Sequence, residues 1–264
     1  MCPYGGRLIG GKPGRAEMVC HCLLIETEAG LVLVDTGFGE DDISKTNGRL
    51  ARSFRWLTRP ALDLKETATA QIKALGFSPN DVQHILLTHL DVDHAGGLSD
   101  FPQAKIHVLA DEFEAALNPQ TYKERQRYVQ AQWAHDPNWV THHPVGESWM
   151  DFECVRDIAG LPSEILFVPL YGHTRGHSAI AVEIGKGGES EWMLHAGDAY
   201  FHHGEMERTP HCPSGLRIFQ AQLSVNDRQR KKNQERLRKL KAEKGDALKL
   251  FCAHDPIELA NSQS

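Results

Sequence analysis

Short apolar runs alternate with polar, glycine-containing segments along the chain, and several of these runs end on histidine or aspartate. The apolar runs at residues 82–88, 165–170 and 247–253 are typical of buried strands. Residues 67–75 carry apolar positions at helical spacing and stop at Gly76, which predicts a helix just before the first of these strands. A helix followed by a turn and a buried strand indicates the α/β class.

Two predicted β-hairpins occupy matching places in the two halves of the chain. The first extends over residues 21–35, and the second extends over residues 177–198 and turns at residues 187–188. In each hairpin the second strand ends on an aspartate, Asp35 or Asp198. This repetition favours two similar halves that pack sheet to sheet.

We expect a single domain over residues 1–264, with an aromatic-rich insertion at about 118–150. Two interpretations stay open for this insertion, because its aromatic side chains could form a wall for an apolar substrate or could simply pack. The polar segment 38–65 is expected to be a loop or lid over the site. The basic segment 226–244 predicts a helix with one solvated face rather than a nucleic-acid contact.

The composition is that of an ordinary globular protein, with 41% hydrophobic and 24% charged residues among 264. A net charge of -6 argues against general nucleic-acid binding. No apolar run reaches the roughly 18 residues of a membrane span, and the first residues lack the pattern of a signal peptide. The six scattered cysteines do not form a disulfide framework, so we expect a reduced, cytoplasmic protein without nucleic-acid or membrane partners.

Residues 88–97 concentrate candidate metal ligands directly after a predicted strand. The four candidates are His89, Asp91, Asp93 and His94. Residues two apart in an extended backbone face the same side, so the first three can converge, and the following turn can bring in His94. Imidazole together with carboxylate suits zinc, iron or manganese rather than calcium or magnesium. The alternative is a solvated loop rich in Asp and His.

The sequence Thr-His-Leu-Asp-Val-Asp-His-Ala-Gly-Gly at residues 88–97 resembles the metal-binding signature of the metallo-β-lactamase superfamily. The usual form of that signature is His-x-His-x-Asp-His, and Asp91 stands where it has the second histidine. The resemblance implies an αββα sandwich of two mixed β-sheets flanked by helices, with the site along their shared edge. It also implies that Asp35 lies under the metals, although a plain turn residue is equally consistent with the sequence.

Three further motifs resemble the remaining ligand positions of that superfamily. Gly-His-Thr-Arg-Gly-His carries His173, Gly-Asp after an apolar strand carries Asp198, and His-Asp after the last predicted strand carries His254. The resemblance therefore implies two half-sites that share Asp198, and two divalent metal ions, zinc first, with iron or manganese as alternatives. It gives His177 no ligand role. The implied metal ligands are His89, Asp91, Asp93, His94, His173, Asp198 and His254.

The resemblance of these motifs, together with the aromatic insertion, implies a hydrolase of carboxylic esters that uses a metal-bridging hydroxide. Lactones such as acyl-homoserine lactones are the first expectation, as in the quorum-quenching lactonases of the superfamily, because the aromatic insertion could seat an acyl chain. Asp93 is the candidate for moving a proton to the leaving oxygen, and Tyr200 for donating to the oxyanion. Those lactonases have a tyrosine one position later, where this chain has Phe201. The expected partner is a small molecule, with the oligomeric state left open, a homodimer included.

Other reactions stay open as alternatives: hydrolysis of thioesters, phosphotriesters or β-lactams, a di-iron oxidoreductase, and a nuclease. A flavo-diiron-like protein also has a carboxylate in the second-histidine position, but it carries a flavin domain for which 264 residues leave no room. A nuclease would need a phosphate-binding surface, for which only segment 226–244 is a candidate. The apparently complete ligand set argues against a non-catalytic binding scaffold.

Asp91 is expected to coordinate a metal rather than to fall short of it. A carboxylate in place of a neutral imidazole adds one negative charge, which should raise the pKa of the bridging water and favour iron or manganese. On this basis Asp91→Ala would lose close to one metal equivalent, whereas Asp91→His would keep two.

Overall fold

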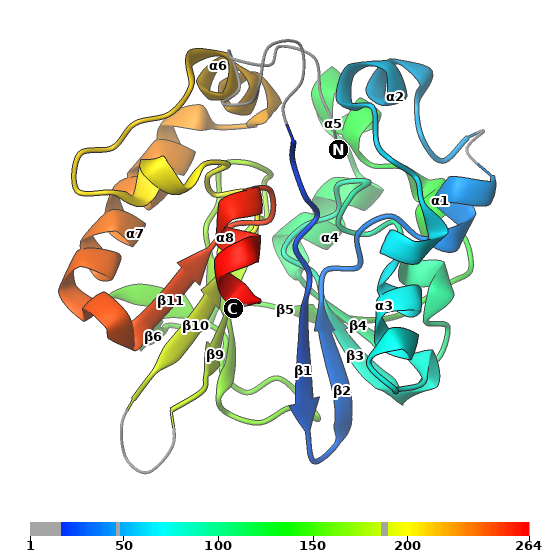
Figure 1. Cartoon of the computed structure of the whole chain (residues 1–264), viewed down its shortest axis with the longest axis horizontal. Coiled ribbons are helices and arrows are strands. Elements are labelled where there is room, and N and C mark those ends of the chain that lie inside the picture. Colours follow the sequence, from blue (N-terminus) through cyan, green and yellow to red (C-terminus); the bar gives the residue numbers. More distant parts are fainter. Residues whose placement is uncertain (1–16, 46–47, 186–189, 264) are drawn as a thin grey trace.

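Two β-sheets lie at the centre of the computed structural model, which describes residues 17–45, 48–185 and 190–263 (Figure 1). The first sheet has the strand order β1-β2-β3-β4-β5, the second has the order β11-β10-β9-β8, and β6 pairs with β7 separately. The strands are β1 (Leu23–Thr27), β2 (Gly30–Val34), β3 (Val82–Leu86), β4 (Lys105–Leu109), β5 (Asn138–His142), β6 (Glu147–Trp149), β7 (Phe152–Cys154), β8 (Ile165–Pro169), β9 (Ser178–Glu183), β10 (Trp192–His195) and β11 (Leu248–Phe251).

Strand direction brings the ends of distant segments to one place. In the first sheet β1 is antiparallel to β2, and β2 to β5 are parallel. In the second sheet β10 is parallel to β11, while β9 is antiparallel to both β10 and β8. Both sheets are therefore mixed. Strands β2, β3 and β4 end at one edge of the first sheet, and β8, β10 and β11 end at one edge of the second.

Helices cover the outer faces of the sheets, with α3 outside the first and α7 outside the second (Figure 1). This arrangement confirms the predicted αββα sandwich. The α-helices are α1 (Glu40–Ser44), α2 (Arg52–Thr58), α3 (Ala68–Ala74), α4 (Ala110–Leu117), α5 (Tyr122–Arg127), α6 (Ser214–Leu223), α7 (Asp227–Lys244) and α8 (Pro256–Ser262). Short 3-10 helices are η2 (Leu64–Glu66), η3 (Pro79–Asp81), η4 (Leu98–Asp100), η5 (Gln130–Gln132), η6 (His203–Met206) and η7 (Gly245–Ala247).

Local sequence explains where the predicted helices begin and which face they bury. The Thr67 side chain accepts a hydrogen bond from the Ala70 N–H and so caps the start of α3, whose Ile72 is buried. The long basic helix α7 buries Leu237 and Leu240, and most of its charged residues are exposed. None of the helices in the described ranges combines the length and apolar character that crossing a membrane requires.

The apolar core between the sheets explains why the strands are continuous hydrophobic runs. Val32 and Leu86 from the first sheet and Phe167 and Ile180 from the second belong to one buried cluster. Strands covered on both faces have no solvent side, so their sequences do not alternate.

One predicted connection differs from the expectation, and the turn of another cannot be compared with it. Segment 38–65, expected to be a loop or lid, contains the helices α1 and α2 in its described part. The strands β9 and β10 pair as the second hairpin predicts, and its turn at residues 187–188 lies outside the described residues.

Candidate metal centre

The loops that follow the parallel strands converge at the common edge of the two sheets. The loop after β3 carries His89, Asp91, Asp93 and His94, and the loop after β2 begins at Asp35. From the second sheet, the loops after β8, β10 and β11 bring His173, Asp198 and His254 to the same place.

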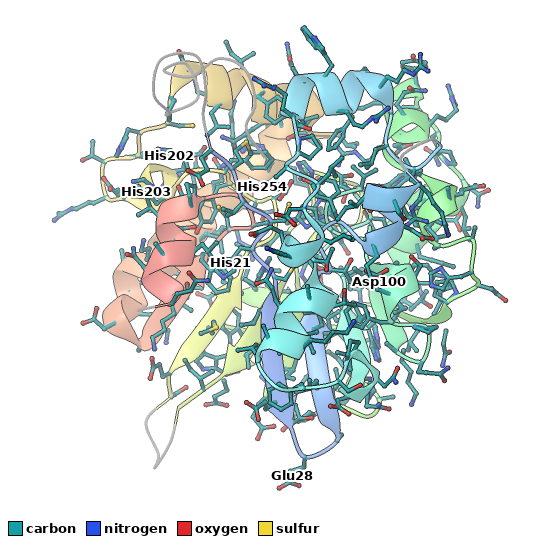
Figure 2. The ribbon with its side chains drawn as sticks, turned by 45° about the vertical axis from the view of Figure 1, so that its right-hand side comes forward. His21, Glu28, Asp100, His202, His203 and His254 are labelled. Carbon is teal, nitrogen blue, oxygen red and sulfur yellow. The ribbon has the colours of Figure 1, made fainter. Side chains whose placement is uncertain are left out.

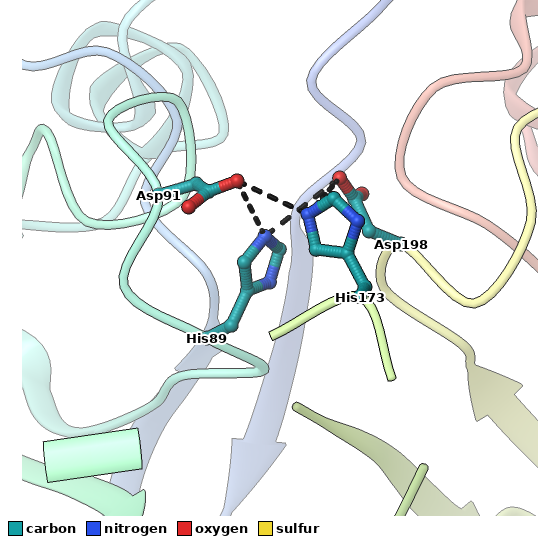
Figure 3. A group of neighbouring side chains, drawn as sticks. All are labelled: His89, Asp91, His173 and Asp198. Carbon is teal, nitrogen blue, oxygen red and sulfur yellow. Dashed lines mark hydrogen bonds and ion pairs between the residues drawn. The ribbon is translucent and has the colours of Figure 1, made fainter. Parts of the chain in front are cut away.

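The first donor group consists of His89, Asp91, His173 and Asp198, whose candidate ligand atoms all lie within 4.8 Å of one another (Figure 3). Asp91 Oδ2 is 3.4 Å from His89 Nε2 and 3.1 Å from His173 Nε2. Asp198 Oδ2 lies 3.2 Å from His173 Nε2 and 3.7 Å from His89 Nε2. Two imidazoles and two carboxylates therefore face a common point.

The second donor group consists of Asp93, His94 and His254. Here the other oxygen of Asp198, Oδ1, lies 3.1 Å from His254 Nε2 and 3.4 Å from His94 Nε2. Asp93 Oδ2 is 3.8 Å from His254 Nε2. Asp198 thus directs one oxygen to each group, which is the geometry of a carboxylate shared between two sites.

Buried atoms without partners show that both groups fit a metal ion. In the described part of the chain, the buried atoms without a hydrogen-bond partner include His173 Nδ1 and four candidate metal-binding atoms of the two groups: His89 Nε2, His94 Nε2, Asp91 Oδ1 and Asp198 Oδ1. Buried polar atoms are normally paired, so such a set needs a reason. A divalent cation at each group would satisfy these four atoms, and the mixture of imidazole and carboxylate is the donor set of zinc, iron or manganese.

Hydrogen bonds behind three of the four imidazoles, those of His89, His94 and His254, orient their Nε2 atoms toward the centre. His94 Nδ1 donates to Asp35 Oδ2 at 2.8 Å, and His254 Nδ1 donates to the Val19 carbonyl at 2.8 Å. His89 Nδ1 lies 2.9 Å from Thr88 Oγ1, which itself donates to Asp35. A proton held at Nδ1 leaves the Nε2 lone pair free for a metal.

Asp35 is more than a turn residue, which settles the alternative that the sequence left open. Its carboxylate accepts from the Thr88 N–H, the Thr88 hydroxyl and His94, and it is 1% exposed. Burial opposes ionisation of this carboxyl, but His94 outweighs it and lowers the pKa of Asp35 below its usual value. Asp35 therefore fixes the candidate ligand His94 and is not itself a member of either donor group.

His177 also supports the centre rather than belonging to it. Its Nδ1 donates to the Leu170 carbonyl at 3.0 Å, and its Nε2 accepts from the Asp198 N–H at 2.9 Å. Both ring nitrogens are used, so His177 fixes the backbone of the shared carboxylate.

The electrostatics of the two groups differ. Burial disfavours a charged His94, yet Asp198 and Asp35 outweigh it and raise the pKa of His94 well above its usual value. For His173, burial and the nearby Arg127 guanidinium lower the pKa to about 3. Burial also opposes ionisation of Asp198, but His254 and His94 hold its pKa well below the usual range. In the absence of metal, protons are therefore held at the second group and not at His173.

Arg127 is a residue of this site that motif reasoning missed. Its Nη1 donates to Asp91 Oδ2 at 2.9 Å, and both side chains are largely buried. Burial opposes ionisation of Asp91, but Arg127 and His89 hold the pKa of this carboxyl well below its usual range. Arg127 lies at the end of α5, inside the aromatic insertion, where no motif or spacing pointed to it.

Glu112 is a second residue that the sequence did not reveal. This fully buried carboxylate accepts from the Leu90 N–H, the Gly176 N–H and the Tyr128 hydroxyl. It therefore joins the loop of His89 and Asp91 to the loop of His173. Gly176 is needed for this approach, because a Cβ there would lie 2.0 Å from the Glu112 nitrogen.

Tyr200 does not face the donor groups. Its hydroxyl donates to Glu258 Oε1 at 2.9 Å, and the side chain is 0% exposed. Its neighbour Phe201 lines the adjoining cavity instead. The oxyanion role of Tyr200 stays a prediction that the geometry does not support.

A cavity of about 430 Å³ adjoins both donor groups. Its floor includes Asp91, Asp93, Asp198 and His254. Its walls are mainly apolar and include Phe54, Leu57, Tyr122, Phe201, Phe219 and Leu223. Helices α2, α5 and α6, which supply most of these wall residues, lie at the same edge of the molecule (Figure 1).

The aromatic insertion contributes less to this wall than the substrate interpretation required. Tyr128, Trp133 and Trp149 are buried in the cores, and Trp139 packs against the core. Tyr122 is the one of these five aromatic residues that lines the cavity. Packing therefore accounts for most of the insertion, while α2 of the predicted lid segment supplies Phe54 and Leu57.

A third histidine cluster beside the centre has a structural explanation. His202 and His203 lie next to each other, with ring centroids 4.3 Å apart (Figure 2), and form a potential donor group with Asp255. Asp255 Oδ1 already accepts from two backbone N–H groups at the start of α8, and Oδ2 accepts from the backbone and ring of His203. The aspartate is thus a helix cap with both oxygens occupied.

Comparison with known proteins agrees with this geometry. Residues 15–254 match the family described as the metallo-beta-lactamase superfamily. A probable metallo-hydrolase of Mycobacterium tuberculosis is 44% identical over 239 residues, which cover 90% of this chain and 75% of that protein. An N-acyl homoserine lactonase of Bacillus cereus is 29% identical over 167 residues, 63% of this chain and 59% of the lactonase.

Solved structures show the same fold. One is an N-acyl homoserine lactone hydrolase with the product N-hexanoyl-L-homoserine bound at its catalytic metal centre. It aligns with a TM-score of 0.70 at 21% identity, covering 98% of this chain and 92% of that one.

Proposed function

Because this chain belongs to the metallo-beta-lactamase superfamily and is a metallo-hydrolase, we propose that it hydrolyses carboxylic esters, and in particular lactones that carry an acyl chain. The observation that carries this proposal is the apolar cavity of about 430 Å³ whose floor contains acidic and histidine donors of both groups. Such a cavity suits a substrate with a polar reacting group at one end and a hydrocarbon tail at the other.

The proposed metal ligands are His89, Asp91, His173 and Asp198 for one divalent ion, and Asp93, His94, His254 and Asp198 for the other. Zinc is the first expectation, with iron and manganese compatible with the same donors. When bound, the two ions would polarise the ester carbonyl and lower the pKa of water from about 15.7 toward about 7. Asp35, Thr88 and Glu112 keep the ligands in position before the substrate arrives.

Asp93 is proposed to handle the proton. Hydrolysis breaks the bond between the acyl carbon and the ester oxygen, and the departing oxygen needs a proton. Asp93 belongs to the second donor group and also lines the cavity, so its carboxyl is within reach of a bound substrate. Phe201 and the apolar walls exclude water from the acyl chain, which would remain bound after a lactone ring has opened.

A fatty acyl thioester is the second candidate substrate, since the apolar walls would hold its tail equally well. A nuclease reaction is less well supported. The cationic residues that line the cavity are Lys123 and Arg127, and Arg127 is already paired with Asp91. Repeated phosphates would therefore find little positive charge there.

The test is turnover by metal-loaded protein of a panel that contains homoserine lactones with acyl chains of increasing length, aryl esters, acyl thioesters, a phosphotriester and a β-lactam. Each buried methylene contributes about 0.8 kcal/mol, so kcat/KM for the lactones should rise about fourfold per methylene until the cavity is filled. Turnover no faster than that of free metal for every ester and lactone would refute the proposal.

Two leucine substitutions distinguish loss of acyl-chain binding in the cavity from a general effect of removing a leucine side chain. Leu57 lines the cavity and is 44% exposed, whereas Leu75, at the end of α3, is 66% exposed and does not line it. Leu57→Ala should flatten the dependence of kcat/KM on chain length, and Leu75→Ala should leave it unchanged. Equal slopes in the two variants would mean that the acyl chain binds elsewhere.

A further inference from the structure

The contact between Asp91 and Arg127 places a buried cation directly against the first donor group. Arg127 Nη1 lies 2.9 Å from Asp91 Oδ2, the same oxygen that is 3.1 Å from His173 Nε2. The side chain of Arg127 is 6% exposed and that of Asp91 is 16% exposed. Of the ion pairs within the described residues, this is the one that joins an arginine or lysine to a carboxylate of either donor group.

From this contact we infer that Asp91 and Arg127 act as one unit, a carboxylate ligand with its own counter-charge, which replaces a neutral histidine at the first metal site. The inference rests on the proposed metal centre and is independent of the proposed substrate. Arg127 is a positioning residue in this scheme, because it touches Asp91 and acts on the metal through it.

Charge balance is the physical reason. The usual second histidine of the superfamily signature is neutral, so Asp91 adds one negative charge to the donors, and Arg127 adds the one positive charge that offsets it. The net charge of Asp91 and Arg127 together is therefore zero, which is also the charge of a neutral imidazole. The sequence led us to expect that Asp91 makes the centre more anionic, but that expectation did not include Arg127. With Arg127 included, the net charge of the first site stays the same as with a histidine.

The guanidinium is held in place independently of Asp91. Arg127 Nη2 donates to the Leu223 carbonyl at 2.5 Å, at the end of α6. Helix α5 is further tied by Glu124, which accepts from Arg175 in the loop that carries His173. With its backbone and its second nitrogen both anchored, Arg127 would stay beside the metal site if Asp91 were replaced.

This anchoring reverses the expectation from the sequence that Asp91→His would keep two metals. In Asp91→His the new imidazole is a good ligand, but Arg127 is left as a buried cation without its carboxylate beside the first site. The positive charge of Arg127 would then repel a metal ion at the first site. The variant should therefore lose close to one metal equivalent, and removing Arg127 as well should restore it.

The experiment measures metal per chain by elemental analysis, after loading with zinc and dialysis, for wild type, Asp91→His, Asp91→His/Arg127→Met and Asp91→His/Lys123→Met. Lys123 is the matched control, because it lies one turn earlier on α5 and donates to the Ser224 carbonyl at 2.8 Å. Like Arg127 it ties α5 to the end of α6, but no ion pair joins it to a donor carboxylate within the described residues. The expected counts are two, one, two and one equivalents.

Two results would overturn the inference. If Asp91→His alone holds two equivalents, the unpaired guanidinium has no effect on the metal. If the double variant with Arg127→Met holds no more than Asp91→His, the loss has another cause. Circular dichroism and thermal unfolding of each variant establish that the counts compare folded proteins.

The single variant Arg127→Met keeps the inference testable if Asp91→His does not fold. It frees Asp91 to act as a full negative ligand, so both metals should stay, and the chelator concentration that removes the first should rise at least about threefold. Release of a metal from folded Arg127→Met would contradict the scheme. If wild type binds fewer than two metals, both this inference and the proposed metal centre are contradicted. If the four metal counts are as expected but no lactone is hydrolysed, only the proposed substrate is contradicted.

Discussion

The two donor groups share Asp198, but different kinds of residue support the candidate ligands in each group. In the second group, His94 and His254 are oriented by Asp35 and by the Val19 carbonyl. In the first group, the Asp91 carboxylate is paired with Arg127, which comes from a helix of the insertion. Under the proposed metal assignment, a metal site keeps its charge while its ligands change, because a compensating ion lies in a neighbouring element.

The largest effect is expected where the two groups are joined. Asp198→Ala removes the oxygens that face both sites, so the chain should lose both metals and kcat/KM should fall on the order of 10⁴-fold or more. Metal analysis and turnover of the preferred ester measure this. The exposed Asp157→Ala is the control, and retention of a full metal equivalent by Asp198→Ala would show that the groups are independent.

The next effect should be confined to the first group. Glu112→Gln replaces a buried carboxylate that accepts from Leu90, Gly176 and Tyr128 by an amide that can accept with only one oxygen. We expect a loss of about 2–4 kcal/mol in the free energy of unfolding and weaker binding of the first metal. Urea unfolding and chelator competition measure both, with the exposed Glu114→Gln on the same helix as control. A change equal to that of the control would remove Glu112 from the support of the site.

The counterpart for the second group is Asp35→Asn. Asp35 has a left-handed backbone, with φ of 56°, and asparagine tolerates this conformation, so the substitution tests the charge and not the turn. Loss of the carboxylate behind His94 should weaken the second metal about 10–100-fold and the first metal less, because Asp35 reaches His89 only through Thr88. Competition with a chelator measures the affinities of the first and the second metal separately. Asp81→Asn, in the cap of η3, is the control, and equal weakening of both metals would contradict the division into groups.

A smaller effect is expected on the pH dependence of metal affinity, because the histidines of the two groups differ in protonation. The raised pKa values of His94 and His254 mean that a metal must displace protons at the second group, whereas His173, with its pKa lowered to about 3, holds none at neutral pH. Raising the pH removes the competing protons, so second-site affinity should increase by up to about tenfold per pH unit for each proton that the metal displaces, below the folded pKa of these histidines. Metal titrations of the metal-free Asp91→Ala variant at pH 6, 7 and 8 measure this affinity. An affinity that is flat over this range would mean that these histidines are already neutral.

The smallest effect concerns the loop that carries the shared aspartate. Tyr200→Phe removes the hydrogen bond to Glu258, so we expect a loss of about 1 kcal/mol in stability and a change in kcat of less than about twofold. Thermal unfolding and steady-state kinetics on the lactone series measure both quantities. A fall in kcat of on the order of a hundredfold would instead support an oxyanion role for Tyr200.

Much of the fold was predictable because its signals are local. Apolar runs, glycine-containing turns and the cap at Thr67 lie within a few residues of the elements that they define. The shape of the cavity was not predictable in this way. The walls come from α2, α5 and α6, and the aromatic residues of the insertion divide between core and wall according to the tertiary position of the segment that carries each one, which residue type alone does not specify.

The sequence by itself, through its local patterns and the resemblance of its motifs to a known superfamily, determined the sandwich, the candidate metal donors and the pairing of two halves. Short motifs at strand ends need only the strands to converge. Only the tertiary structure decided how those donors are supported. Asp35 reaches His94 and Glu112 reaches Gly176 across 59 and 64 positions of chain, respectively. Arg127 meets Asp91 across 36. A buried charge finds its partner through packing and not through spacing, so the counter-charge of the first site appears only when the helices are in place.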